Sequence, residues 1–173
     1  MQDNIIVKPS VEKQFDRFLR QGRVLFFSAP CGFGKTAVAE ALLSSREVLR
    51  LPADSVGSKL PSAEADWQIL LLDDLQDMQE EQDWNALCEL IRACPERRFV
   101  LLSRGTPPGS LMAFQYTGLM TVLEADDLLF DADDVRRLLR LYGVEAADSE
   151  IDGILKESVG YPLGVAITAR CMS

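Results

Sequence analysis

Short, continuous apolar runs recur along the first part of the chain, and amphipathic stretches separate them. Runs of this kind are typical of strands buried on both faces. They predict strands at residues 24–27, 48–51, 68–72, 98–103 and 120–123. Apolar residues at helical spacing predict helices at residues 10–20, 36–43, 80–93 and, more weakly, 107–114. Strands that alternate with helices predict a parallel sheet covered on both faces, its strands joined by right-handed crossovers.

The pattern changes after Glu124. Three helical segments follow one another, at residues 131–142, 148–159 and 162–172, and no strand pattern lies among them. Upstream, residues 53–66 mix polar residues with Gly57 and Pro61, which predicts a loop with at most one helical turn. The sequence therefore predicts an α/β core over residues 1–124 and a small all-helical subdomain over residues 125–173.

Composition and charge narrow the classes of function. The 173 residues suffice for one compact domain with a small appendage. The net charge of -9 argues against adhesion to nucleic acid or anionic lipid, so neither direct DNA contact nor a membrane is expected. The sequence has no histidine and its cysteines form no Cys-x-x-Cys pair, which argues against a zinc or redox site. Without a secretion signal or a membrane-length apolar run, a cytoplasmic location with free thiols is expected.

A glycine-rich loop stands between the first predicted strand and the second predicted helix. It reads Ser28-Ala-Pro-Cys-Gly-Phe-Gly-Lys-Thr36. The pattern Gly-x4-Gly-Lys-Thr wraps backbone N–H groups around phosphate and opens a helix whose N-terminus faces the anion. Ala29 stands where the first glycine usually stands, a mild change because the steric demand there is weak. The residues expected around the phosphates are Cys31, Gly32, Phe33, Gly34, Lys35, Thr36 and Ala37.

Side chains in the loop and at the ends of two predicted strands suggest distinct roles in nucleotide binding. Lys35 would reach the β and γ phosphates, and Thr36 would ligate magnesium through its hydroxyl. Two carboxylates, Asp73 and Asp74, end the third predicted strand, and ligands of open α/β sheets lie beyond the carboxyl ends of the strands. Asp73 is therefore expected to face the magnesium, and Asp74 to orient or deprotonate an attacking water. Arg104, at the end of the fourth strand, either senses the γ phosphate or is a surface arginine.

These elements together resemble the nucleotide-binding domain of STAND-class ATPases, and most closely that of the large LuxR-type transcriptional regulators that include the maltose regulator. In that group the phosphate loop commonly reads S-A-P-A-G-x-G-K-T, so the alanine is typical of it. Its acidic strand is similar to Leu70-Leu-Leu-Asp-Asp-Leu75, and its sensor strand to Ser103-Arg-Gly-Thr-Pro-Pro108. The stretch from Leu128 to Leu139 and the element Gly160-Tyr-Pro-Leu-Gly164 also match. The proline of that element packs near the adenine in related proteins, which implies this role for Pro162.

The resemblance implies a P-loop NTPase fold, a three-layer α/β/α core with a five-stranded parallel sheet followed by a helical lid. It also implies ATP or ADP with Mg²⁺ as cofactors, slow hydrolysis at most, and self-association in the nucleotide-bound state. Family members carry a winged helix, sensor repeats and a C-terminal helix-turn-helix, none of which is present here, so an N-terminal piece of a larger regulator is expected. Residues 53–66 are shorter than the helical segment that relatives have there, which affects any partner contact or switch made by that segment.

Other functions stay open at this point. A free-standing P-loop ATPase or small-molecule kinase would use a mobile, arginine-rich lid, and the helical part contains Arg136, Arg137 and Arg140. Their spacing also suits a helix face exposed to solvent. An inactive fold that nucleotide only stabilises is a third interpretation.

Overall fold

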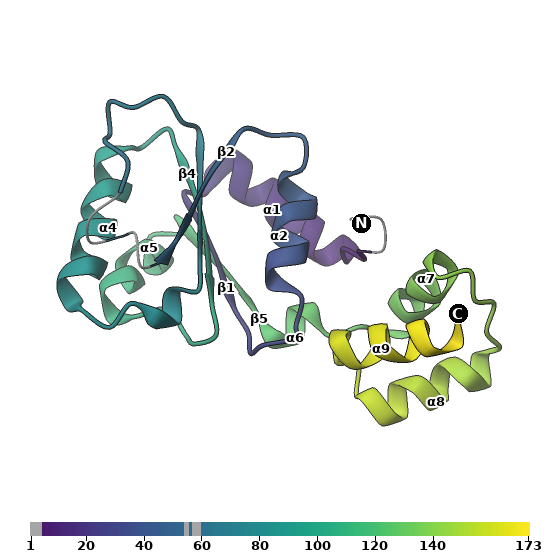
Figure 1. Cartoon of the computed structure of the whole chain (residues 1–173). Coiled ribbons are helices and arrows are strands. Elements are labelled where there is room, and N and C mark those ends of the chain that lie inside the picture. The colour runs from purple at the N-terminus through teal and green to yellow at the C-terminus, as the bar shows by residue number, and fades with distance from the viewer. Residues whose placement is uncertain (1–4, 54–55, 57–59) are drawn as a thin grey trace.

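The computed structural model describes residues 5–53, 56 and 60–173, and its central feature is a five-stranded parallel sheet (Figure 1). The strand order is β2-β3-β4-β1-β5, so β4 lies between the strand that precedes the glycine-rich loop and the strand that ends in the two aspartates. The strands are β1 Val24–Ser28, β2 Val48–Pro52, β3 Ile69–Asp73, β4 Arg98–Ser103 and β5 Met120–Glu124. The paired residues Ser28 and Ser103 align the carboxyl ends of β1 and β4.

Helices cover both faces of the sheet and make three layers (Figure 1). Successive residues of β1 point to opposite faces, so Phe26 packs in one hydrophobic cluster and Phe27 in the other. On one face lie α1 Pro9–Gln21 and α2 Lys35–Leu43, and on the other α4 Glu81–Ala93 and α5 Met112–Tyr116. The predicted α/β fold class is confirmed, because strands apolar on both faces need a helical layer on each side.

The last part of the chain is helical. A short helix, α6 Ala125–Leu128, follows β5, and then come α7 Ala132–Leu141, α8 Asp148–Ser158 and α9 Pro162–Met172. We call α7, α8 and α9 the C-terminal helices. They pack around their own hydrophobic cluster, which includes Val135, Ile151 and Val165. Ile6, from the segment before α1, is buried in the same cluster, so the amino-terminal segment is tied to the C-terminal helices.

The predicted elements differ from the observed ones mainly at their ends. The weak helix at 107–114 is instead a 3-10 turn, Gly109–Leu111, followed by α5, because Pro107 and Pro108 precede the first turn. The patterns at 75–77 and 125–128 were too short to predict the 3-10 turn Leu75–Asp77 and α6. The predicted loop at 53–66 lies partly outside the described residues. Among the residues that the structure describes, no helix is both long and apolar enough to cross a bilayer.

Candidate functional site

The glycine-rich loop turns tightly between β1 and α2. Gly32 and Gly34 have φ angles of 83° and 77°, in the left-handed region that glycine adopts without a Cβ penalty. Gly34 is the N-cap residue of α2. Within the described residues, the backbone N–H groups from Gly32 to Ala37 donate to no backbone or side-chain acceptor. The loop therefore offers consecutive unpaired donors at a helix N-terminus, which is the arrangement that binds anions.

Ala29, at the position of the usual first glycine, is part of the core. Only 1% of its surface is exposed, and its methyl group packs in the cluster beneath α1 and α2. Ala29 does not have a positive φ angle, so its backbone does not require glycine. Its N–H donates to the Ser103 carbonyl at 3.3 Å, which joins the loop to β4. An alanine here supports the loop.

Lys35 folds back over the loop that precedes it. Its Nζ donates to the Ala29 carbonyl at 2.6 Å and to the Pro30 carbonyl at 3.0 Å. Burial lowers the pKa of Lys35 from its ordinary value, while the nearby Asp73 carboxylate opposes that change. The ammonium is thus partly desolvated among acceptors at the glycine-rich turn, where its interaction with a phosphate would be strong.

Thr36 and Asp73, the two residues expected around magnesium, meet at the carboxyl end of the sheet. The Thr36 hydroxyl donates to Asp73 Oδ2 at 2.8 Å, and Asp73 Oδ1 accepts the Asp74 backbone N–H at 2.7 Å. A hydroxyl and a carboxylate are the hard oxygen donors that Mg²⁺ prefers. The donor set at this point therefore fits Mg²⁺.

Asp74 and Arg104 also lie together, and a residue that the sequence did not single out connects them. Asp74 has a φ of 58°, rare for a residue other than glycine. Its Oδ1 lies 3.6 Å from Arg104 Nη2. The Gln76 amide donates to Asp74 Oδ1 at 2.8 Å, while its carbonyl oxygen accepts the Arg104 backbone N–H at 3.1 Å. Gln76 thus ties the acidic end of β3 to the end of β4, and its position two residues after Asp74 was the only signal in the sequence.

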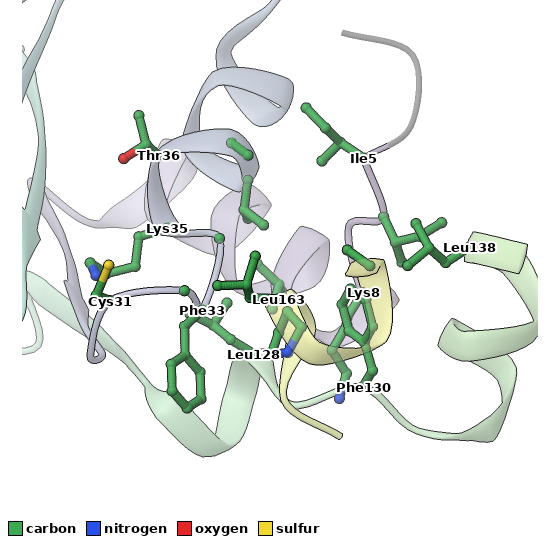
Figure 2. A pocket seen from close by; sticks show the side chains of 18 of the residues that line it. Ile5, Lys8, Cys31, Phe33, Lys35, Thr36, Leu128, Phe130, Leu138 and Leu163 are labelled. Carbon is green, nitrogen blue, oxygen red and sulfur yellow. The ribbon is translucent and has the colours of Figure 1, made fainter. Parts of the chain in front are cut away.

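A cavity of about 500 Å³ opens from the loop toward the C-terminal helices. Figure 2 shows Lys35 and Thr36 at its polar end, and Ile5, Phe130 and Leu138 at its apolar end. The apolar end is formed by the amino-terminal segment, the stretch after α6, α7 and the start of α9. Pro162 lines this cavity together with all of the expected phosphate-loop residues, Asp73, Asp74 and Arg104.

Lys8 joins the elements that form the apolar end, and no motif predicted this. Its ammonium donates to the Leu129 carbonyl and lies 3.7 Å from Asp134 Oδ2. Asp134 is only 2% exposed, and burial raises the pKa of its carboxyl. Arg137 contacts the same carboxylate at 3.5 Å and donates to the Val7 carbonyl at 3.3 Å. The segment before α1 is thereby held on α7.

The arginines of α7 do not line the cavity. Arg136 pairs with Asp133 at 2.6 Å and with Asp148 at 2.8 Å. Arg137 binds Asp134, and Arg140 is exposed. These contacts indicate that the three arginines lie on the surface of the C-terminal helices, away from the residues expected to bind phosphates.

Solved structures similar to this one share its fold. One is the replication initiator DnaA bound to AMPPCP and single-stranded DNA, with a TM-score of 0.66, 17% identity, and coverage of 99% of this chain and 63% of that chain. A Walker-type ATPase of Pyrococcus abyssi gives a TM-score of 0.65 at 10% identity, with 96% and 67% covered. A STAND protein with a tetratricopeptide repeat sensor from Pyrococcus horikoshii gives 0.62 at 12% identity, with 95% and 30% covered.

Sequence comparisons add no closer relationship. No protein-family model matches the chain, and no curated protein matches it. The chain spans about two thirds of the length of the first two solved structures named above, and less than a third of the STAND protein. The parallel sheet, its helical layers and the structural similarities together establish the fold: the chain has the α/β architecture of P-loop ATPases.

Proposed function

We propose that this chain binds ATP and ADP as the nucleotide switch module of a STAND-class regulator, of the LuxR type that its motifs resemble. The observation that carries the proposal is the glycine-rich loop. Its N–H groups from Gly32 to Ala37 have no partner among the described residues, and the loop lines a cavity shared with the C-terminal helices. A ligand in this cavity contacts both parts of the chain. Its binding free energy therefore depends on how the two parts are arranged, as a nucleotide switch requires.

Each end of the cavity suits one end of a nucleotide. The N–H groups from Gly32 to Ala37 and the Lys35 ammonium supply donors and positive charge for phosphates. The apolar end, lined by Phe130, Leu138 and Pro162, accommodates a planar base. In this proposal residues 1–124 form the nucleotide core and residues 125–173 the lid, so the C-terminal helices belong to the lid.

The residues around the phosphates would have distinct roles. Thr36 and Asp73 would hold Mg²⁺, which neutralises phosphate charge when it is bound. Asp74, held by Gln76, would orient a water, and Arg104 would contact the γ phosphate. The Asp74 carboxylate also lies near Arg104, so occupation of the γ position would compete for this arginine and distinguish ATP from ADP.

Slow hydrolysis is expected in this proposal. Among the residues that line the described cavity, Arg104 is the one arginine, and it contacts Asp74. Charge neutralisation in related chemistry is often completed by an arginine supplied from elsewhere. The lid arginines Arg136 and Arg137 are held in ion pairs outside the cavity, which disfavours the alternative of a small-molecule kinase. In the full regulator, further domains and self-association would read the nucleotide state.

The direct test is to identify what the purified chain binds. Nucleotide released on heat denaturation would be identified by chromatography, and ADP and ATP affinities would then be measured by calorimetry, with turnover followed in ATP and Mg²⁺. Lys35→Ala is expected to abolish detectable nucleotide affinity, because it removes the cation at the phosphate turn. Lys156→Ala, which removes an exposed lysine on α8, is the matched control and should bind as the parent chain does.

Each outcome has a distinct meaning. Nucleotide affinity with negligible turnover supports a switch module. Steady ATP turnover that depends on a second substrate would instead show that the chain acts as an enzyme and not as a switch module. Unchanged affinity in Lys35→Ala would show that the nucleotide does not bind at this loop.

A further inference from the structure

Tyr161, the residue before Pro162, lies directly against the phosphate loop. Its hydroxyl donates to the Cys31 carbonyl at 3.0 Å. Its ring meets the Phe33 ring edge to face, with centroids 5.3 Å apart. The contact with Gly32 is so close that a Cβ built on this glycine would lie 1.8 Å from the Tyr161 hydroxyl oxygen. The side chain of Tyr161, the N-cap residue of α9, therefore lies against the apex of the loop.

A second contact comes from Leu163, in the first turn of α9. The Leu163 backbone N–H donates to the Gly32 carbonyl at 3.1 Å. The start of α9 thus binds the carbonyls of two successive loop residues, Cys31 and Gly32. The N–H groups that follow in the loop stay unpaired within the described residues. Holding the carbonyls from one side orients the peptide planes, and with them the N–H groups that a phosphate would bind.

The chain before Tyr161 is bent in a way that points this residue at the loop. Val159 and Gly160 both have left-handed φ angles, 53° and 76°. This conformation is unfavourable for a β-branched residue, and it persists only where the surroundings impose it. Gly160 is pinned to Phe130, whose N–H donates to the Gly160 carbonyl at 2.8 Å, and a Cβ on Gly160 would lie 2.5 Å from the Phe130 carbonyl oxygen.

We propose that Tyr161 is a positioning residue that couples the lid to the phosphate loop: its hydroxyl and the Leu163 N–H hold the loop carbonyls, so that phosphate affinity depends on the lid being docked. The inference rests on the proposed nucleotide function and adds the contact through which the lid acts. By reciprocity, a bound phosphate chain favours the docked lid to the same extent. The coupling acts at the phosphates, whereas Pro162 acts at the apolar end.

Tyr161→Phe is the test, because it removes the hydroxyl and keeps the ring. Tyr116→Phe is the matched control, since Tyr116 is 82% exposed and lies on α5, away from the cavity. Calorimetry with ADP and with inorganic tripolyphosphate, which has no base, separates the two ends of the cavity. We expect Tyr161→Phe to weaken both ligands about fivefold, the effect of one hydrogen bond, and Tyr116→Phe to change neither.

A second readout needs no ligand. Cys31 and Cys171 are the exposed cysteines, so a Cys171→Ser background leaves Cys31 as the exposed thiol on the loop. Iodoacetamide should alkylate Cys31 severalfold faster when Tyr161→Phe is added, because the loop is released from the lid.

The results separate the two proposals. Failure of the parent chain to bind ADP would refute the nucleotide function itself. Normal ADP binding by the parent, with ADP and tripolyphosphate affinities in Tyr161→Phe equal to those of the Tyr116→Phe control, would refute only the role of Tyr161. Loss of ADP affinity without loss of tripolyphosphate affinity would also refute it, since Tyr161 would then act at the base.

Discussion

The contact between Gly32 and Tyr161 predicts an unusually costly glycine substitution. In Gly32→Ala the new methyl group would lie 1.8 Å from the Tyr161 hydroxyl oxygen and 2.6 Å from Cζ, so the ring must move off the loop. An alanine at a φ of 83° costs ~1–2 kcal/mol by itself. Displacing the ring costs ~1 kcal/mol for its hydrogen bond to Cys31 and ~0.5–1.5 kcal/mol for the Phe33 contact. We expect a total loss of about 2.5–4.5 kcal/mol in the free energy of unfolding.

Gly34→Ala provides the control for the backbone term. Gly34 has nearly the same φ, 77°, but nothing lies within 4 Å of a Cβ built on it. Gly34→Ala should therefore lower the free energy of unfolding by only ~1–2 kcal/mol, the cost of an alanine with a left-handed φ angle. The difference between the two variants isolates the Tyr161 contact.

Urea unfolding followed by circular dichroism measures both losses, and a double-mutant cycle completes the test. In a Tyr161→Ala background the cost of Gly32→Ala should fall to that of Gly34→Ala, because the clash is gone. Equal costs for the two glycine variants in the parent chain would refute the reasoning, as would a Gly32→Ala cost that Tyr161→Ala leaves unchanged.

Two further predictions concern hydrogen bonds at the candidate site and in the C-terminal helices. Gln76→Ala should lower the preference for ATP over ADP about fivefold, because Asp74 and Arg104 lose their common partner. Calorimetry with each nucleotide measures this preference. An unchanged preference would show that Gln76 does not help to distinguish the two nucleotides. Asp131→Ala should cost ~1 kcal/mol in urea unfolding, since it caps α7. Hydrogen bonds from backbone N–H groups, above all that of Asp134, lower the pKa of Asp131 below 3.8. The stability that the Asp131 carboxylate contributes is therefore present above pH 3.8 and disappears as the pH falls through the lowered pKa. Asp152→Ala, on the exposed side of α8, should show neither effect.

Local sequence determined the secondary-structure elements and the glycine-rich turn. The apolar runs around Phe26 and Leu71 predict strands without reference to the rest of the chain, because a strand buried on both faces needs an unbroken apolar run. Gly32 and Gly34 predict the loop equally locally, since their left-handed backbone follows from the absence of a Cβ. The carboxyl ends of parallel strands meet at one edge, and so Thr36 and Asp73 could be predicted to lie together although 37 residues separate them.

Only the tertiary structure decided which residues reach the loop from elsewhere. Placing β4 between β1 and β3 brings Arg104 next to Asp74 and gives Gln76 two partners, and apolar strands of similar length do not specify that order. Tyr161 looked like an ordinary residue before a helix-opening proline. It meets Cys31 across 130 residues because two left-handed residues turn the chain and the C-terminal helices dock on the loop. The identity and spacing of neighbouring residues determine which helices and strands form. Contacts between residues far apart in the sequence depend on how these elements pack against one another.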